Sequence, residues 1–252
     1  MNVLRTWTVG AVVGLFSLAS LTAQHAPVRV IASNGVKTFV EALVPAYEKS
    51  SGRKVAVTYG TSSGLVKDVT SGARFDVFIA TTEAVTLVSQ AGKLTSEPHT
   101  VLGRSQVGVG VRQGARKPRI GTAAELKQAA LEAKAVTYAG NGASRPHIDA
   151  MFARLGIADA VKAKALLEQG SERAIARVNA GDADLLITLV SEILPAPGIE
   201  LVGPLPPEFR SDVTFAAAVG ASAADPAAAR ALIGSLVSAE ATPILRQKGL
   251  ER

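Results

Sequence analysis

The 252-residue sequence contains no cysteine, which excludes disulfide bonds and thiolate metal sites. Its three histidines, His25, His99 and His147, lie far apart, and no spacing typical of metal ligands links them. A Walker phosphate loop and an H-E-x-x-H helix are also absent. We therefore expect the protein to use neither a metal nor another cofactor.

Aromatic residues make up only 4% of the chain, and the net charge of +6 is spread along it. No run of Lys or Arg is longer than two residues, so the sequence lacks both the basic stripe and the stacking residues of a nucleic-acid binder. A mild positive balance is consistent with an anionic ligand, or with solubility alone.

The longest apolar run, Val9 to Leu21, is too short for a membrane span. It follows a basic start that ends at Arg5 and precedes Ala23, a small residue suited to cleavage. We predict that residues 1–23 are a cleavable signal peptide and that the mature protein is periplasmic, with no membrane insertion. The alternative is an uncleaved anchor.

Two stretches, Val28–Gly35 (VRVIASNG) and Thr58–Gly64 (TYGTSSG), share one pattern. Each is a strand-like run that breaks at small hydroxyl residues and glycine, directly before a helical pattern. The free N–H groups of a helix N-terminus, together with the hydroxyls of Ser33 and Ser63, form a suitable anion site. The alternative is ordinary N-capping, in which these residues only cap the N-termini of the helices.

Strands and helices alternate through residues 28–90 and again through residues 123–189, which indicates open α/β sheets. The first part includes a short helix expected over Leu65–Thr70. The strand Ser105–Arg112 and the basic segment up to Gly121 lead into a second lobe, and the strand Val213–Val219 returns to the first. We predict one lobe from residues 24–104 with 210–252, and another from residues 105–209.

The order of these elements resembles the periplasmic solute-binding proteins that include the molybdate- and tungstate-binding proteins. Three segments carry the resemblance in the first lobe: Ala32–Gly35, Gly60–Gly64 and Phe75–Ala80 (FDVFIA). The closing segment Thr242–Leu250 also matches. The resemblance implies a type II periplasmic binding fold, in which two open-sheet α/β lobes are joined by a two-strand hinge and close over a ligand.

In the molybdate binders, serines of the two first-lobe turns contact the oxyanion, and these positions correspond to Ser33 and Ser63, with Ser62 as a neighbour. The second lobe supplies a tyrosine whose position is taken here by Leu189. Arg145 follows a Gly-Asn-Gly-Ala-Ser turn, where a guanidinium suits a carboxylate. The alternative for Arg145 is a solvated residue. The predicted ligand-binding residues are Ser33, Asn34, Thr61, Ser62, Ser63, Ser144, Arg145, Ser171 and Leu189.

Two functions are compatible with this pattern. The first is a monomeric binding protein that captures a small anion, preferably an organic carboxylate, and delivers it to an inner-membrane ABC permease. The second is an aconitate isomerase, an activity found on proteins that resemble this family. An isomerase needs a proton-shuttling group, for which the candidates are His147, Glu172 and Glu192. The alternative for these three is a role at a helix start or surface.

Overall fold

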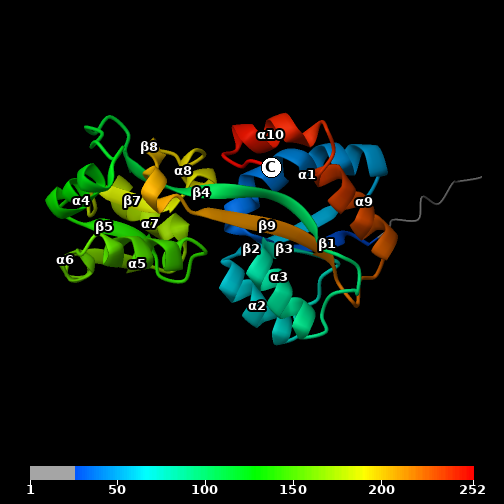
Figure 1. The fold of residues 1–252 in the computed structure, drawn as a ribbon. Coiled ribbons are helices and arrows are strands. Elements are labelled where there is room, and N and C mark those ends of the chain that lie inside the picture. Colours follow the sequence, from blue (N-terminus) through cyan, green and yellow to red (C-terminus); the bar gives the residue numbers. More distant parts are fainter. Residues whose placement is uncertain (1–25) are drawn as a thin grey trace, which may run out of the picture.

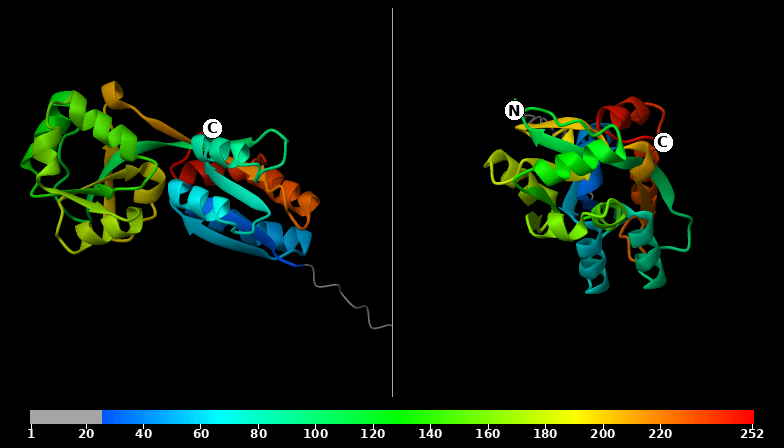
Figure 2. Two further views of the ribbon diagram at one scale, coloured as in Figure 1. Left: turned by 90° about the horizontal axis from the view of Figure 1, so that it is seen from below. Right: turned by 60° about the vertical axis from the view of Figure 1, so that its left-hand side comes forward.

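The computed structural model describes residues 26–252, so the predicted signal peptide lies outside the described residues. The chain forms two open-sheet α/β lobes joined by long strands, which confirms the predicted fold class (Figure 1). The left view of Figure 2 shows the lobes side by side, with the strands passing between them. Within residues 26–252, no helix has the length and apolar character needed to cross a membrane.

Lobe 1 is built on three parallel strands, with a fourth strand antiparallel to the third. These are β1 (Val28–Ser33), β2 (Val55–Gly60), β3 (Val77–Thr81) and β9 (Asp212–Val219). One face is covered by α1 (Lys37–Ser51), α9 (Pro226–Leu236) and α10 (Ala241–Gln247), and the other by α2 (Ser62–Thr70) and α3 (Thr82–Gln90) (Figure 1). Both faces of the sheet are therefore buried.

The sequence of β3 explains this double burial. All five of its residues are buried, and successive side chains alternate between the two faces. Val77 and Ile79 pack in the cluster that contains α1, whereas Phe78 and Ala80 pack in the cluster that contains α2 and α3. A continuous apolar run is the expected pattern for a strand covered on both sides.

Lobe 2 repeats the arrangement with parallel strands β5 (Val136–Ala139), β6 (Ala165–Glu168) and β7 (Leu185–Leu189). Strand β8 (Ile199–Pro204) pairs with the linking strand β4. The helices are α4 (Ala123–Glu132), α5 (Arg145–Arg154), α6 (Ala158–Lys162), α7 (Ser171–Asn179) and α8 (Val190–Ile193). Two 3-10 turns, η1 (Asn34–Val36) and η2 (Pro207–Phe209), complete the described elements.

The first connection between the lobes is one continuous strand, β4 (Thr100–Arg112), and the chain returns from β8 through η2 to β9. Residues 100–106 pair with β9, whereas residues 107–112 pair with β7 and β8. The chain therefore enters lobe 2 inside a strand, and the segment up to Gly121 follows the crossing. A single core cluster includes side chains of both lobes and continues through the hinge.

Candidate functional site

The turns that follow β1 and β2 lie next to each other because these strands are paired in parallel. The register places Ser33 beside Gly60, at the carboxyl ends of both strands. In open α/β sheets, ligands bind at this edge. The turn that follows β5 in lobe 2 contacts the turn after β2 through Asn141. The helix that follows β6 contacts the start of α1 through the Glu172–Lys37 pair. We call the turns after β1, β2, β5 and β6, together with the first turns of the helices that follow them, the interlobe region.

A buried serine pair forms the lobe 1 side of the interlobe region. The Ser62 hydroxyl donates to the Ser33 hydroxyl over 3.1 Å and accepts from the Thr81 N–H at 3.4 Å. Ser33 is the N-cap residue of η1, but its side chain makes no capping bond. Ser62 does not cap α2, because Thr61 does so by accepting from the Gly64 N–H at 3.2 Å. Ser33 and Ser62 are therefore free of the ordinary capping role.

Helix α2 begins at Ser62, three residues earlier than the apolar pattern predicts. The segment Gly60–Gly64 also matches the G-x-S-x-G pattern of hydrolase nucleophile turns, in which the serine has a strained backbone. Here, no non-glycine residue among positions 26–252 has a positive φ, and the Ser62 hydroxyl bonds only Ser33 and Thr81. Within residues 26–252, no histidine is hydrogen-bonded to Ser62.

Asn141 joins the two lobes, and sequence reasoning missed it. Its side-chain oxygen accepts from the Gly170 N–H at 3.1 Å, which links the turns after β5 and β6. Its side-chain amide nitrogen donates to the Thr61 hydroxyl at 3.4 Å, and its main-chain carbonyl accepts from the Ser63 hydroxyl at 3.0 Å. The signal was its place directly after a predicted strand, the same position that drew attention to Ser33.

The predicted clamp Arg145 is engaged within lobe 2. Its Nε lies 2.5 Å from an Asp149 carboxylate oxygen one helical turn away, and its guanidinium stacks 5.3 Å from the Tyr138 ring centre. Ser144 is buried beside it and makes no capping bond. His147 is half-buried in the first turn of the same helix.

Glu192, in the helix α8 that follows β7, is a carboxyl group with a raised pKa. It accepts hydrogen bonds from the hydroxyls of Ser171, at 2.8 Å, and Thr188. The residue keeps some solvent exposure, yet the protein packed around its carboxyl raises the pKa above the ordinary value, and the two hydroxyls oppose that shift only in part. A carboxyl group with a raised pKa keeps its proton to a higher pH than an ordinary glutamate, and its ionised form is a stronger base; both properties suit proton transfer.

Leu189 and Glu172 have different environments. Leu189 is buried, and its Cδ1 is within 3.0 Å of the position a Cβ on Gly35 would occupy, so it packs against the lobe 1 turn and offers no donor.

Glu172 is exposed and forms a 2.8 Å ion pair with Lys37 of lobe 1, which raises the pKa of that lysine. Sequence reasoning also missed Lys37. Asn34 is half-buried in the same turn as Ser33.

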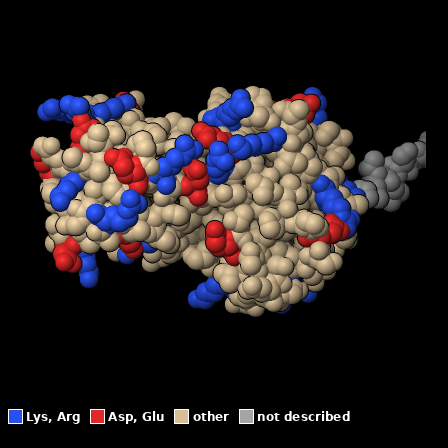
Figure 3. Space-filling view, in the orientation of Figure 1, with Lys and Arg blue, Asp and Glu red and all other residues tan. Residues whose placement is uncertain are grey.

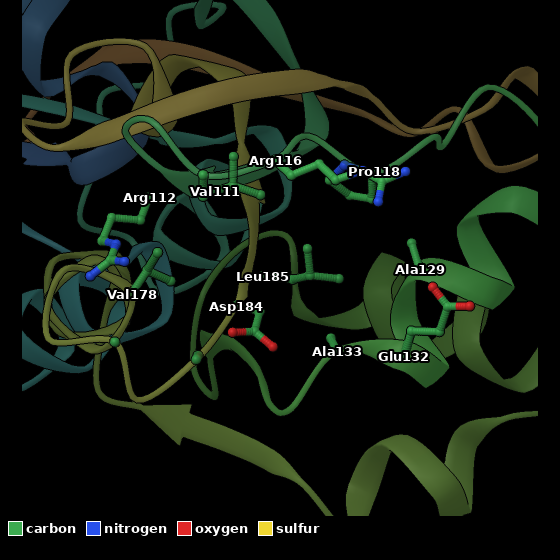
Figure 4. Close-up of a pocket in the computed structure, with 13 residues that line it drawn as sticks. Val111, Arg112, Arg116, Pro118, Ala129, Glu132, Ala133, Val178, Asp184 and Leu185 are labelled. Atoms are coloured by element: carbon green, nitrogen blue, oxygen red, sulfur yellow. The ribbon is translucent and has the colours of Figure 1, made fainter.

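A separate cavity of about 330 Å³ lies in lobe 2, away from the interlobe region (Figure 4). Arg112 and Arg116 line one side of it, and Asp184 and Glu132 line the other. Leu185, at the start of β7, places this cavity at the amino end of the parallel strands. Because ligands of such sheets bind at the carboxyl ends, we assign the site to the interlobe region.

The charged side chains are mixed in sign on the face of the described residues that Figure 3 shows. On the face shown in Figure 3, Lys and Arg are interspersed with Asp and Glu over both lobes. Within residues 26–252, no cluster of three or more His, Asp or Glu side chains is arranged to hold a metal ion. The interlobe region contains hydroxyls, amides and helix N-termini, which suit a small anion, besides the charged side chains of Lys37, Arg145 and Glu172.

Comparison with known proteins gives concordant relatives. The family model for bacterial extracellular solute-binding proteins matches residues 28–251. An aconitate isomerase from a Pseudomonas species is 28% identical over 254 residues, covering 98% of this chain and 96% of that protein. The molybdate-binding protein ModA of Azotobacter vinelandii is 26% identical over 245 residues, 92% of each chain. A solved periplasmic molybdate-binding protein from that organism superposes with a TM-score of 0.74 at 17% identity, covering 89% of this chain and 99% of that one.

Proposed function

The chain belongs to the bacterial extracellular solute-binding protein family, and we propose that it captures a small organic carboxylate between its lobes in the periplasm. An inner-membrane ABC importer is the partner that would receive the ligand. The Ser33–Ser62 hydroxyl pair carries this proposal, because it lies buried at the carboxyl ends of two strands without a capping role.

The donor set supports a carboxylate over a tetrahedral oxyanion. Leu189, at the position where the molybdate binders have a tyrosine, is buried against Gly35 and supplies no hydrogen bond to an oxyanion. The relative that acts on aconitate, a tricarboxylate, is matched over nearly the whole of both chains. Hydroxyls and helix N-termini from both lobes provide hydrogen-bond donors for several carboxylate groups of one ligand.

A second candidate function is isomerisation of aconitate. The specific observation that favours it is Glu192, whose pKa is raised by the surrounding protein and whose carboxyl is held by Ser171. In such a reaction a base removes a C–H proton from the ligand, the double bond moves along the carbon chain, and a proton returns to another carbon. No oxidant or reductant is needed, so a single carboxyl group is chemically sufficient.

A thermal-shift screen tests the binding proposal. The panel contains cis-aconitate, trans-aconitate, citrate, molybdate, tungstate, sulfate and phosphate. A ligand that binds only the folded state raises the apparent stability by mass action. We expect a carboxylate to give the largest shift, and a response to molybdate or tungstate alone would contradict the proposal.

Proton NMR of each aconitate isomer with the protein tests the second candidate. Conversion that is lost in Glu192→Gln supports isomerisation. Binding of both isomers without any conversion rejects it and leaves the binding function in place.

A further inference from the structure

The two lobes are fastened to each other by side chains of this protein. At one point, Asn141 of lobe 2 contacts Thr61 and Ser63 of lobe 1 through two hydrogen bonds. At another, Glu172 near the start of α7 pairs with Lys37 at the start of α1. These contacts join residues separated by 78 to 135 positions in the sequence.

We propose that Asn141 and the Lys37–Glu172 pair form an interlobe clasp that stabilises the closed lobes and limits the size of the anion held between them. The proposal deepens the proposed function, because it names residues that determine the specificity of the same site. Its first test does not depend on any ligand.

Asn141 is prepared for this role by its own lobe. The bond from the Gly170 N–H to its side-chain oxygen fixes the orientation of the amide, and this leaves the amide nitrogen directed to Thr61. Little side-chain freedom is then lost when the lobes meet, which makes the bond from the Asn141 amide to Thr61 more effective; the bond from Ser63 goes to the main-chain carbonyl of Asn141.

The ion pair has a complementary character. The Lys37 and Glu172 side chains are 35% and 69% exposed, so the pair lies at the solvent-facing side of the interlobe region. Lys37 also lies 5.6 Å above the centre of the Tyr59 ring, which restricts its position. An exposed pair of this kind changes an equilibrium by about fivefold or less.

The size limit follows from the lengths of these contacts. Bonds of 2.8 to 3.4 Å are already at hydrogen-bonding distance, and any increase in lobe separation breaks them. A ligand that fits between the closed lobes keeps the clasp, whereas a larger ligand loses it. Removing the clasp therefore weakens small ligands selectively and leaves large ligands nearly unchanged.

A distance measurement on the protein without added ligand tests the clasp. The chain has no cysteine, so Ser89→Cys on α3 and Ala160→Cys on α6 give one spin label on each lobe at exposed positions. Double electron–electron resonance then reports the separation of the lobes. We expect a single short distance in the otherwise unaltered chain and an added longer population in Asn141→Ala and Glu172→Ala.

The charge-swapped variant Lys37→Glu with Glu172→Lys keeps an ion pair but exchanges its two charges, so it distinguishes the effect of the pair from the effect of either charge alone. We expect it to recover most of the population with the short distance. Lys54→Ala is the matched control, because Lys54 forms a 3.0 Å pair with Glu48 inside lobe 1. Unchanged distance distributions in Asn141→Ala and Glu172→Ala would overturn the clasp, as would a predominantly long distance in the unaltered chain.

Calorimetric titration with malonate and citrate tests the size limit. In Glu172→Ala we expect malonate affinity to fall about fivefold and citrate affinity to stay within about twofold. Equal losses for both anions would overturn the size limit. A wild-type protein that binds no carboxylate would refute the proposed function and the size limit together, while the distance measurement still decides whether the clasp closes the lobes.

Discussion

Ser62→Ala tests the buried serine pair most sharply. The change removes one hydroxyl that lies between Ser33 and the Thr81 N–H and leaves the backbone of α2 intact. Ser63→Ala is the matched control, because Ser63 is exposed and donates to the Asn141 carbonyl in the other lobe. The two variants remove the same atom from adjacent residues.

The expected effect on binding is large and the effect on stability is small. A hydrogen bond to a charged ligand contributes about 1.5–3 kcal/mol, which corresponds to a roughly 10- to 150-fold loss of affinity. The Thr81 N–H loses a contact that is already long, at 3.4 Å, which costs about 1 kcal/mol. Alanine favours a helix more than serine does, which offsets part of that cost.

Isothermal titration with the most strongly stabilising carboxylate measures the affinity, and urea unfolding measures the stability. We expect Ser63→Ala to lose no more than about fivefold in affinity, since it breaks one neutral interlobe bond. The reasoning is refuted if Ser62→Ala binds as tightly as the wild type, or if its affinity falls only in proportion to lost folded protein.

Three further changes have defined outcomes. In Gly35→Ala the new methyl would lie 2.4 Å from the Phe215 ring, so we expect a loss of about 1–3 kcal/mol in urea unfolding, and wild-type stability would contradict this packing. Burial acts to raise the pKa of Asp76, but the Arg29 ion pair and two N–H donors outweigh it and hold the pKa below its usual range. Asp76→Ala should therefore cost about 2–4 kcal/mol at pH 7, with a smaller difference from wild type as the pH falls through the acidic range; a constant difference would argue against the ion pair. Because the folded pKa of Glu192 is raised, wild-type stability should fall as the pH rises from about 4.5 through that pKa, and Glu192→Gln should lack this slope; equal slopes would contradict the assignment.

Most of the fold follows from hydrophobic periodicity. The alternation of strands and helices and the run Phe75–Ala80 predict two open-sheet lobes, and the structure has both, with their strands linked into one sheet through β4 and β9. The start of α2 does not follow from periodicity, because its first turn contains small polar residues. Thr61 caps its N-terminus and so sets where the helix begins. A helix start was expected at Glu192, and the four-residue helix α8 begins two residues earlier, at Val190, directly after β7.

The candidate site was predictable only for residues whose neighbours belong to the same lobe. Ser33 and Ser62 follow strands that pair in parallel, so their proximity is contained in the strand order. Asn141 and Lys37 act through the other lobe, and no local pattern relates positions so distant in sequence. The partner of Arg145 was available in the sequence, because Asp149 lies four residues further along the same predicted helix.

A crystal structure of the protein grown with the carboxylate that stabilises it most tests the central claim directly. The account predicts the ligand between the lobes, with carboxylate oxygens within hydrogen-bond distance of Ser33 and Ser62 and of donors from the turns after β5 and β6. A ligand found instead in the lobe 2 cavity beside Arg112 and Asp184 would contradict the account.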